Sequence, residues 1–305
     1  MPTSAVVSLP CHAKVNLGLR VIAAREDGYH EIRTILHTVG LHDTLEVRKA
    51  ARTSLEIREE WCCGPGGTVP LDASNLVLRA AGELKGELGR RGAAFKLTKR
   101  VPPGSGMGAA SSDAAAALVA LNRLYSLALD PVALHRAAAR LGSDVPFFLY
   151  GGACLALGRG EEIYPLPEGP LIHLVLVFPG EGLSTPLVYR RWDDLLTSED
   201  KTSSMNDFAP WSLVLRGGSP AVANDLERAA IELSPSLVRV RSALLKSGAK
   251  AVSMTGSGSA FFGIYSGARQ AEHAALLLKR AGLSAVPTSS LGREEWEAGF
   301  RAGER

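Results

Sequence analysis

The clearest pattern of apolar and polar positions lies near the beginning of the chain, between residues 13 and 21. Odd-numbered positions there are apolar, whereas Lys14, Asn16, Gly18 and Arg20 occupy the even positions. Because successive side chains of a strand point to opposite faces, this period of two predicts a half-buried β-strand. Its polar face is open to two interpretations: an ordinary exposed face, or a fixed cation and an amide that point into a site.

Beyond this strand, strand-like and helix-like segments alternate along the chain. The pattern predicts strands at 44–48, 55–57, 95–100, 153–157, 173–178, 251–254 and 261–265. It predicts helices at about 75–88, from the end of a glycine-rich loop to about 125, and at 131–141, 235–247 and 272–280. The polar and weakly periodic stretch 196–220 is expected to be a surface loop. Such alternation is typical of an α/β protein.

Length and composition narrow the class of protein. With 305 residues we expect two domains or one large one, and a composition break at 158–169 places a boundary near residue 165. An apolar fraction of 46% and a charged fraction of 21% exclude global disorder. The net charge of +3 comes without a long basic tract, so we expect no nucleic-acid partner.

Signals for export, membrane insertion and disulfide bonding are weak. The first ten residues do not read as a signal peptide, and no run of 18 apolar residues suggests a membrane span. Of the four cysteines, Cys62 and Cys63 are adjacent, Cys11 and Cys154 stand alone, and no C-x-x-C spacing occurs. We therefore expect reduced thiols in a cytoplasmic protein that has no membrane partner.

A glycine-rich loop precedes the alanine-rich helix. Its members are Gly104, Ser105, Gly106, Met107, Gly108, Ala109, Ala110, Ser111 and Ser112. Small residues let backbone amides approach an anion, and a helix N-terminus favours negative charge, so the loop predicts a phosphate-binding turn. It is not a Walker A loop, because no lysine precedes the serines.

Two other interpretations of this loop stay open. It could be a flexible linker that happens to contact a helix cap. The spacing G-x-G-x-x-A, with Asp130 lying 21 residues beyond Ala109, also resembles a dinucleotide-binding turn. Pro102 and Pro103 separate the loop from the preceding strand, which disfavours binding of NAD.

Three further clusters could take part in a reaction. Ser143-Asp144-Val145-Pro146 is either a helix N-cap or an ionised carboxylate that accepts a proton. Gly28-Tyr29-His30 is either a hairpin tip or a pair that stacks on a base and hydrogen-bonds it. The segment 255–260 is either a tight turn or a second row of backbone donors. Together with the loop and Lys14, these clusters suit phosphoryl transfer, in which catalysis is mainly positioning and charge stabilisation.

The order of five motifs resembles that of the GHMP kinases. These motifs are PCHAKVNL at 10–17, DGYHEI at 27–32, GSGMGAASSDAA at 104–115, LGSDVPF at 141–147 and MTGSGSA at 254–260. The resemblance covers nearly all of residues 5–290. Within the family, AKVNL, DGYHEI and GSDVPFF are similar to the branch that phosphorylates a cytidine-diphosphate-linked methylerythritol in the non-mevalonate isoprenoid pathway.

The resemblance implies an α/β (α+β type) fold of two domains with the site in the cleft between them. Residues 1–165 would form an ATP-binding and catalytic domain, and residues 166–290 a ferredoxin-like substrate domain. Residues 291–305 lie outside the resemblance and receive no role. The protein would be a kinase that uses ATP and Mg²⁺, as a monomer or homodimer. A related kinase acting on mevalonate, homoserine or a sugar, and a non-catalytic nucleotide-binding module, stay as alternatives.

The resemblance also implies roles for individual residues. Asp144 would take the proton from the 2-hydroxyl of the substrate, and Lys14 would stabilise charge beside it. The residues implied for ATP are Asn75, Pro102, Pro103, Gly104, Ser105, Gly106, Met107, Gly108, Ala109, Ala110, Ser111 and Ser112. Those implied for the phosphate acceptor are Asn16, Tyr29, His30, Thr185, Tyr189, Gly256, Ser257 and Gly258. The resemblance leaves the ligands of Mg²⁺ unknown.

Some positions depart from the family pattern. Met107 replaces a usual leucine, and Ala109 and Ala110 stand where glycines are common. Asp113 stands where asparagine is usual. Its carboxylate would lie near the triphosphate, where it could repel ATP or help to hold Mg²⁺.

Overall fold

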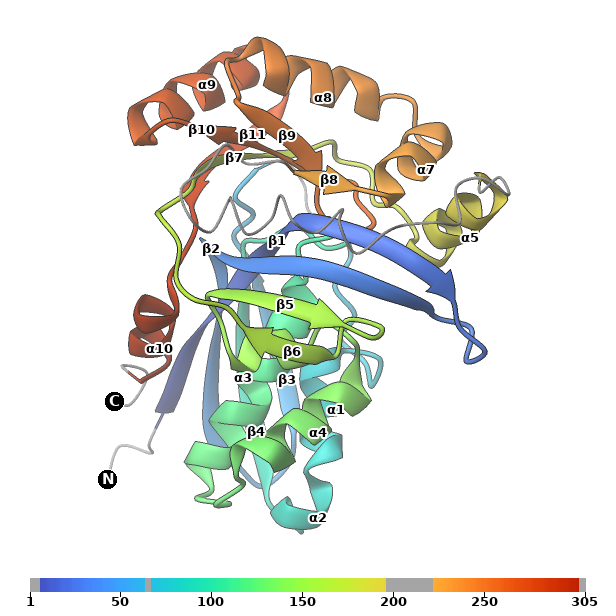
Figure 1. The fold of residues 1–305 in the computed structure, drawn as a ribbon. Helices are drawn as coiled ribbons and strands as arrows, with labels where there is room; N and C mark the ends of the chain where they lie inside the picture. The colour runs from blue at the N-terminus through green and yellow to red at the C-terminus, as the bar shows by residue number, and fades with distance from the viewer. Residues whose placement is uncertain (1–5, 64–66, 196–221, 302–305) are drawn as a thin grey trace.

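Two β-sheets, stacked one above the other, organise the chain (Figure 1). The computed structural model describes residues 6–63, 67–195 and 222–301. The predicted loop at 196–220 lies outside these residues. Of the helices within these residues, none is both long and apolar enough to cross a lipid bilayer.

The first sheet is built on a long hairpin. Strands β1 (Val6–Ala24) and β2 (His30–Ala50) pair antiparallel around the Asp27-Gly28 turn. The sheet order is β3-β4-β2-β1-β8, and β5 and β6 extend the sheet from β2. The other strands are β3 (Ser54–Glu59), β4 (Gly92–Lys99), β5 (Ala153–Leu157), β6 (Glu162–Pro165) and β8 (Ala223–Asn224).

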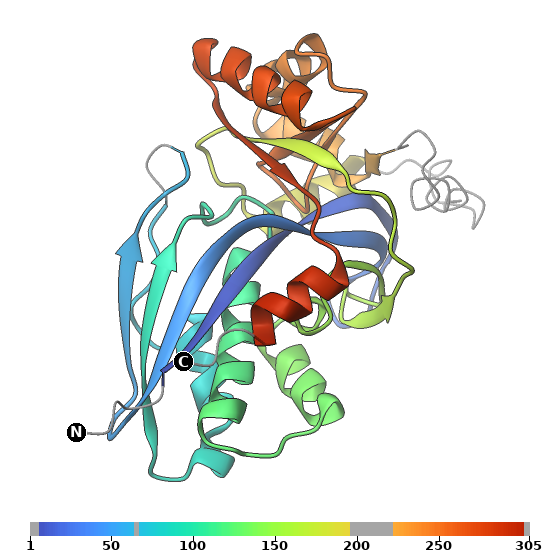
Figure 2. The same ribbon diagram turned by 90° about the vertical axis from the view of Figure 1, so that its left-hand side faces the viewer.

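Helices cover one face of this sheet, as Figure 2 shows. They are α1 (Leu76–Glu83), α2 (Lys85–Leu88), α3 (Ala109–Leu124) and α4 (Pro131–Leu141), followed by the short 3₁₀ helix η1 (Pro146–Leu149). The alanines in the middle of α3, at 114–117 and 120, are buried in the core against the sheet, because small side chains let a helix approach it closely.

The second sheet is antiparallel, with strand order β11-β7-β10-β9. Its strands are β7 (His173–Phe178), β9 (Ala251–Met254), β10 (Phe261–Tyr265) and β11 (Ser284–Ser289). One face packs against α7 (Leu226–Leu233), α8 (Leu237–Lys246) and α9 (Ala268–Arg280). The other face packs on the middle of β1 and β2, so that an apolar core joins the two sheets.

The prediction of a half-buried strand at 13–21 is wrong in one respect. Lys14 and Asn16 are each only 2% exposed, so the polar face of β1 is covered as well as the apolar one. The covering comes from the glycine-rich loop and from the turn after β9, which are far away in the sequence. Local periodicity carries no information about such contacts.

Several predicted elements are confirmed, among them α4, β5, β7, β9 and β10, whereas others differ. The expected helix at 75–88 divides at Leu84, and the expected strand at 44–48 is part of the longer β2. The helix after the glycine-rich loop begins at Ala109, so Ser111 and Ser112 lie in its first turn. The sequence pattern did not predict β6, β8, β11, α5 (Thr185–Leu195), α7 or α10 (Arg293–Arg301).

The C-terminal segment returns to the first sheet. Trp296 and Phe300 of α10 are buried in the core of the first layer, and Arg123 of α3 donates a hydrogen bond to the carbonyl of Phe300. The domain boundary near residue 165 stays a prediction. β6 belongs to the first sheet and β7 to the second, while β8 and α10 come back to the first layer.

Candidate active site

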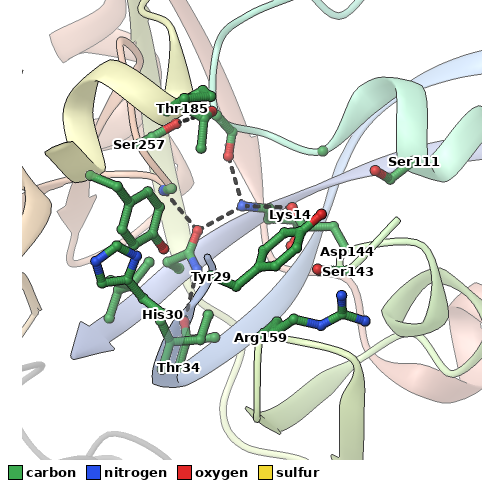
Figure 3. Close-up of a pocket in the computed structure, with 18 of the residues that line it drawn as sticks. Lys14, Tyr29, His30, Thr34, Ser111, Ser143, Asp144, Arg159, Thr185 and Ser257 are labelled. Carbon is green, nitrogen blue, oxygen red and sulfur yellow. Dashed lines mark hydrogen bonds and ion pairs between the residues drawn. The ribbon is translucent and has the colours of Figure 1, made fainter. Parts of the chain in front are cut away.

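A cavity of about 760 Å³ opens between the two layers (Figure 3). Its walls are the β1–β2 hairpin, the glycine-rich loop, the segment before η1, helix α5 and the turn after β9. Most of the expected catalytic and acceptor-site residues line it: Lys14, Asn16, Tyr29, His30, Asp144, Thr185, Tyr189, Gly256 and Ser257. Residues from five separate segments therefore meet in one place.

A second cavity of about 240 Å³ lies on the other side of the glycine-rich loop. Asn75, Pro102, Pro103 and every residue from Gly104 to Ser111 line it. Gly106, Gly108 and Ser111 line both cavities. The loop is thus a common wall across which two bound molecules could meet. Ser112 and Gly258, which were also expected in the site, line neither cavity.

Lys14 lies at the back of the larger cavity. Its Nζ donates to Oδ1 of Asn16 at 2.8 Å and to the carbonyl of Gly106 at 2.7 Å, and it lies 3.6 Å from Oδ2 of Asp144. Burial lowers the pKa of the Lys14 ammonium, and the carboxylate of Asp144 opposes that shift. A cation is therefore fixed beside the carboxylate by three oxygen atoms.

Asn16 connects β1 to the turn after β9. Its Oδ1 accepts hydrogen bonds from Lys14, from the hydroxyl of Thr255 at 3.1 Å and from the amide of Gly256 at 2.8 Å. Its Nδ2 donates to Oγ1 of Thr34 at 2.8 Å. These contacts position Lys14 and the second glycine turn. Thr34 lies on β2 in a stretch where the sequence pattern predicted no strand, so no sequence signal pointed to it.

Asp144 does not cap a helix. Val145 precedes η1 without a side-chain cap, and the carboxylate of Asp144 faces Lys14 and the cavity instead. Its side chain is 40% exposed, whereas that of Lys14 is 3% exposed. Of the two interpretations left open by the sequence, the accessible carboxylate fits the structure.

The aromatic end of the cavity brings together the hairpin tip and α5. The rings of His30 and Tyr189 stack with centroids 4.7 Å apart, and Nε2 of His30 lies 2.8 Å from Oδ1 of Asp193. The guanidinium of Arg159 lies 4.7 Å from the centre of the Tyr29 ring, which is half exposed. Arg159 and Asp193 were not predicted from the sequence, because neither stands in a recognisable motif.

The glycine-rich loop is held against the turn after β9. The amide of Ala260 donates to the carbonyl of Ser105, and the amide of Lys14 donates to that of Met107. Gly106 has a φ of +76°, and a Cβ there would collide with the carbonyl of Thr255. Helix α3 then starts without a side-chain cap, so its N-terminus is available to an anion.

Asp113 lies below this loop in a buried charge cluster. Lys99 forms ion pairs with both Asp113, at 2.8 Å, and Asp43. Burial raises the pKa of Asp113 to about 7, although Lys99 opposes the shift. Both Lys99 and Asp113 line the smaller cavity. Oδ2 of Asp113 is thus already bound by an internal cation.

The described residues offer no group of three or more histidine, cysteine, aspartate or glutamate side chains that could hold a metal ion. A metal at this site would therefore depend on oxygen atoms of a bound ligand and on water. The Ser111 hydroxyl, on the wall shared by the two cavities, is a hard oxygen donor of the kind that Mg²⁺ accepts.

Comparison with known proteins connects this geometry to a family. The GHMP kinase N-terminal domain model matches residues 75–152, and the GHMP kinase C-terminal model matches residues 212–282. The chain is 37% identical over 290 residues to a 4-diphosphocytidyl-2-C-methyl-D-erythritol kinase of Moorella thermoacetica, covering 94% of this chain and 99% of that protein.

Two further comparisons agree. A protein of the same name from Solibacter usitatus is 40% identical over 273 residues, covering 87% of this chain and 83% of that one. A crystal structure of 4-(cytidine 5'-diphospho)-2C-methyl-D-erythritol kinase superimposes with a TM-score of 0.77 at 39% identity, covering 93% and 99% of the two chains. This chain therefore belongs to the 4-diphosphocytidyl-2-C-methyl-D-erythritol kinases, a family of the GHMP kinase superfamily.

Proposed function

We propose that this kinase transfers the γ-phosphoryl group of ATP to the 2-hydroxyl of 4-diphosphocytidyl-2-C-methyl-D-erythritol, giving the 2-phosphate and ADP in the non-mevalonate isoprenoid pathway. One observation supports this most strongly. The Lys14–Asp144 pair lies in the larger cavity, directly beside the loop that separates it from the smaller one.

ATP takes the smaller cavity in this proposal. The triphosphate lies along the glycine-rich loop toward the N-terminus of α3, where backbone amides and the helix dipole favour negative charge. Asn75 lies at the adenine. The hydroxyl of Ser111, together with phosphate oxygens and water, would hold Mg²⁺, which would supply positive charge to neutralise the phosphates. Ser112 supports the first turn of α3, where its amide donates to the carbonyl of Gly108.

The acceptor takes the larger cavity, with its 2-hydroxyl at Asp144. The carboxylate removes the hydroxyl proton as the oxygen attacks the γ-phosphorus, and the ammonium of Lys14 stabilises the charge that develops there. The accessible carboxylate in front of a buried cation suits these two roles, because substrate can reach the base while the cation stays fixed.

The cytidine diphosphate end lies toward the aromatic residues. Tyr29, His30 and Tyr189 hold the cytosine, and Asp193 fixes the orientation of the His30 ring. Arg159 and Arg190, which also line the cavity, supply positive charge for the diphosphate. The hydroxyls of Thr185 and Ser257, 2.7 Å apart, bring α5 and the turn after β9 to the same ligand. Gly258 belongs to this turn, although it does not line the cavity.

The test is an assay of ADP release with three acceptors: the cytidine-diphosphate-linked methylerythritol, mevalonate and homoserine. We expect rapid release with the first alone. Preference for mevalonate or homoserine would assign the chain to another GHMP kinase activity, and nucleotide binding with no turnover would indicate a binding module. The Asp144→Asn variant, prepared identically, controls for contaminating kinases. The oligomeric state and the cytoplasmic location stay predictions from the sequence.

A further inference from the structure

Two adjacent thiols lie outside the cavities described above. The Sγ atoms of Cys62 and Cys63 are 3.6 Å apart, both side chains are half-buried, and neither residue forms a disulfide bond. The pair follows β3, where the amide of Cys62 donates to the carbonyl of Arg100 at 3.0 Å. It packs against the apolar core that joins the two sheets.

The environment makes Cys63 the more reactive thiol. The hydrogen bond from Cys62 lowers the pKa of Cys63, and the ammonium of Lys279 on α9 lowers it further, although burial opposes the shift. The pKa of Cys62 is raised, because its proton is shared with Cys63. Two thiols, one of them with a lowered pKa, are thus held together in a half-exposed position, as a reagent that reacts with two thiols requires.

The spacing of the sulfur atoms suits a single soft atom bound between them. An atom that forms three pyramidal bonds, with about 2.3 Å to each sulfur and an angle of about 100° between them, holds its two sulfur ligands about 3.5 Å apart, close to the separation present here. A structural zinc ion would need further protein ligands, which the described residues do not supply. The matching ligand therefore brings its own third substituent.

We propose that Cys62 and Cys63 form a binding site for a monosubstituted trivalent arsenical. Each sulfur forms one bond to arsenic, the arsenic–oxygen bond of the reagent breaks, and its oxygen leaves as water with the two thiol protons. No group is oxidised or reduced in this exchange. Cys11 and Cys154 are buried and lie apart from the pair, so they offer no second site of this kind.

The site is coupled to the smaller cavity through the backbone hydrogen bond of Cys62. Arg100, which accepts the hydrogen bond from Cys62, lies two residues before Pro102 of the cavity wall. Further along, a Cβ on Gly67 would lie 3.2 Å from the ring of Pro103, and Thr68, Val69 and Pro70 line the cavity. An occupied dithiol therefore displaces this wall and weakens binding of ATP. This coupling rests on the proposed nucleotide site, whereas arsenical binding does not.

The first test uses phenylarsine oxide and intact-mass measurement of the full chain. We expect one arsenical per chain, lost in Cys62→Ser and in Cys63→Ser and retained in Cys11→Ser and Cys154→Ser. Zinc chloride should give no stoichiometric complex. Retention of the arsenical in both single variants of the pair would overturn the site. Should those variants fail to fold, protection of Cys62 and Cys63 in the unmodified chain against iodoacetamide, located by peptide mapping, decides the same question.

The second test measures ATP dependence before and after modification. We expect the KM for ATP to rise several-fold, and to return when 2,3-dimercaptopropanol, but not a monothiol, is added. An unchanged KM on a stoichiometrically modified chain would overturn the coupling to the cavity. Failure of the untreated chain to release ADP would instead count against the proposed function and would leave the mass measurement intact.

Discussion

The Nζ atom of Lys14 lies 3.6 Å from Oδ2 of Asp144, yet the lysine side chain is 3% exposed and the aspartate side chain 40% exposed. The ammonium of Lys14 is thus buried behind the carboxylate of Asp144, and the carboxylate is the more accessible of the two groups to a ligand. A merely structural ion pair at a surface contributes about 0–1 kcal/mol, which is a weak reason to bury a lysine. The arrangement is better explained by its effect on the charge and reactivity of Asp144.

Replacing Asp144 with asparagine removes the proposed base while keeping the shape of the side chain. We expect kcat to fall by about 10²- to 10⁴-fold, the usual contribution of a general base, and the KM for ATP to change little. Steady-state kinetics with a nucleotide-binding measurement check both statements. Ser143→Ala, at a neighbouring cavity residue, serves as the control and should keep most of the activity. Full activity of Asp144→Asn would remove the residue from the mechanism.

The pH dependence of kcat reports on Lys14. Burial lowers its pKa, so the ammonium loses its proton at a lower pH than an ordinary lysine would. Activity should therefore decline as the pH rises through that lowered pKa. Lys14→Arg, which stays protonated throughout, should have a lower rate but no such decline. An alkaline decline of unchanged position in the arginine variant would assign it to another group.

Base recognition is tested at Tyr29. Loss of a base-stacking ring costs about 1–3 kcal/mol, so Tyr29→Ala should weaken inhibition by CMP by about 5- to 150-fold, whereas Tyr29→Phe should keep most of it. Tyr164→Ala is the matched control, because this tyrosine is similarly exposed at 49% but lines neither cavity. Equal affinity of Tyr29→Ala and the control for CMP would place the base elsewhere.

Short local motifs made it possible to predict the glycine-rich loop, Asp144 and Lys14 from the sequence. The smaller cavity lies at the predicted phosphate-binding loop, and Asn75, Pro102 and Pro103 line its wall. Arg159 and Asp193 could not be found, since their positions depend on how β5, β6 and α5 pack around the hairpin tip. Burial of Lys14 was missed for the same reason: the residues that cover it are about 90 and 240 positions away.

Asp113 makes the stability of the chain pH-dependent. Its pKa of about 7 in the folded chain exceeds the ordinary value of 3.8, so the folded state binds more protons between these values. The free energy of unfolding therefore falls, through this group, as the pH rises from about 4 to 7. The Asp113→Asn variant has no carboxyl group at this position, so its free energy of unfolding does not fall with pH through this group. Its stability relative to the parent chain should rise over that range by at most about 4 kcal/mol and stay level above it.

Urea unfolding at several pH values measures this difference. The control is Asp43→Asn, at the other carboxylate on Lys99. Asp43 also accepts hydrogen bonds from the amides of Arg100 and Val101, so its replacement should destabilise the chain at neutral pH instead. A difference between Asp113→Asn and the parent chain that does not vary with pH would show that Asp113 keeps an ordinary pKa.

The C-terminal helix α10 is expected to contribute to stability and not to the reaction. Trp296 is 6% exposed, its ring stacks on Phe300 with centroids 4.3 Å apart, and it packs tightly over Gly151. Trp296→Ala should lower the free energy of unfolding by about 3–5 kcal/mol, the usual cost of removing a large core side chain. Leu276→Ala, at a leucine that is 56% exposed on α9, should change the free energy of unfolding by less than about 0.5 kcal/mol.

Because α10 lines neither cavity, the folded fraction of Trp296→Ala should keep the parent kcat. Equal stabilities of the two variants would mean that α10 is not anchored in the core, whereas a selective fall in kcat would give the C-terminal segment a part in the site.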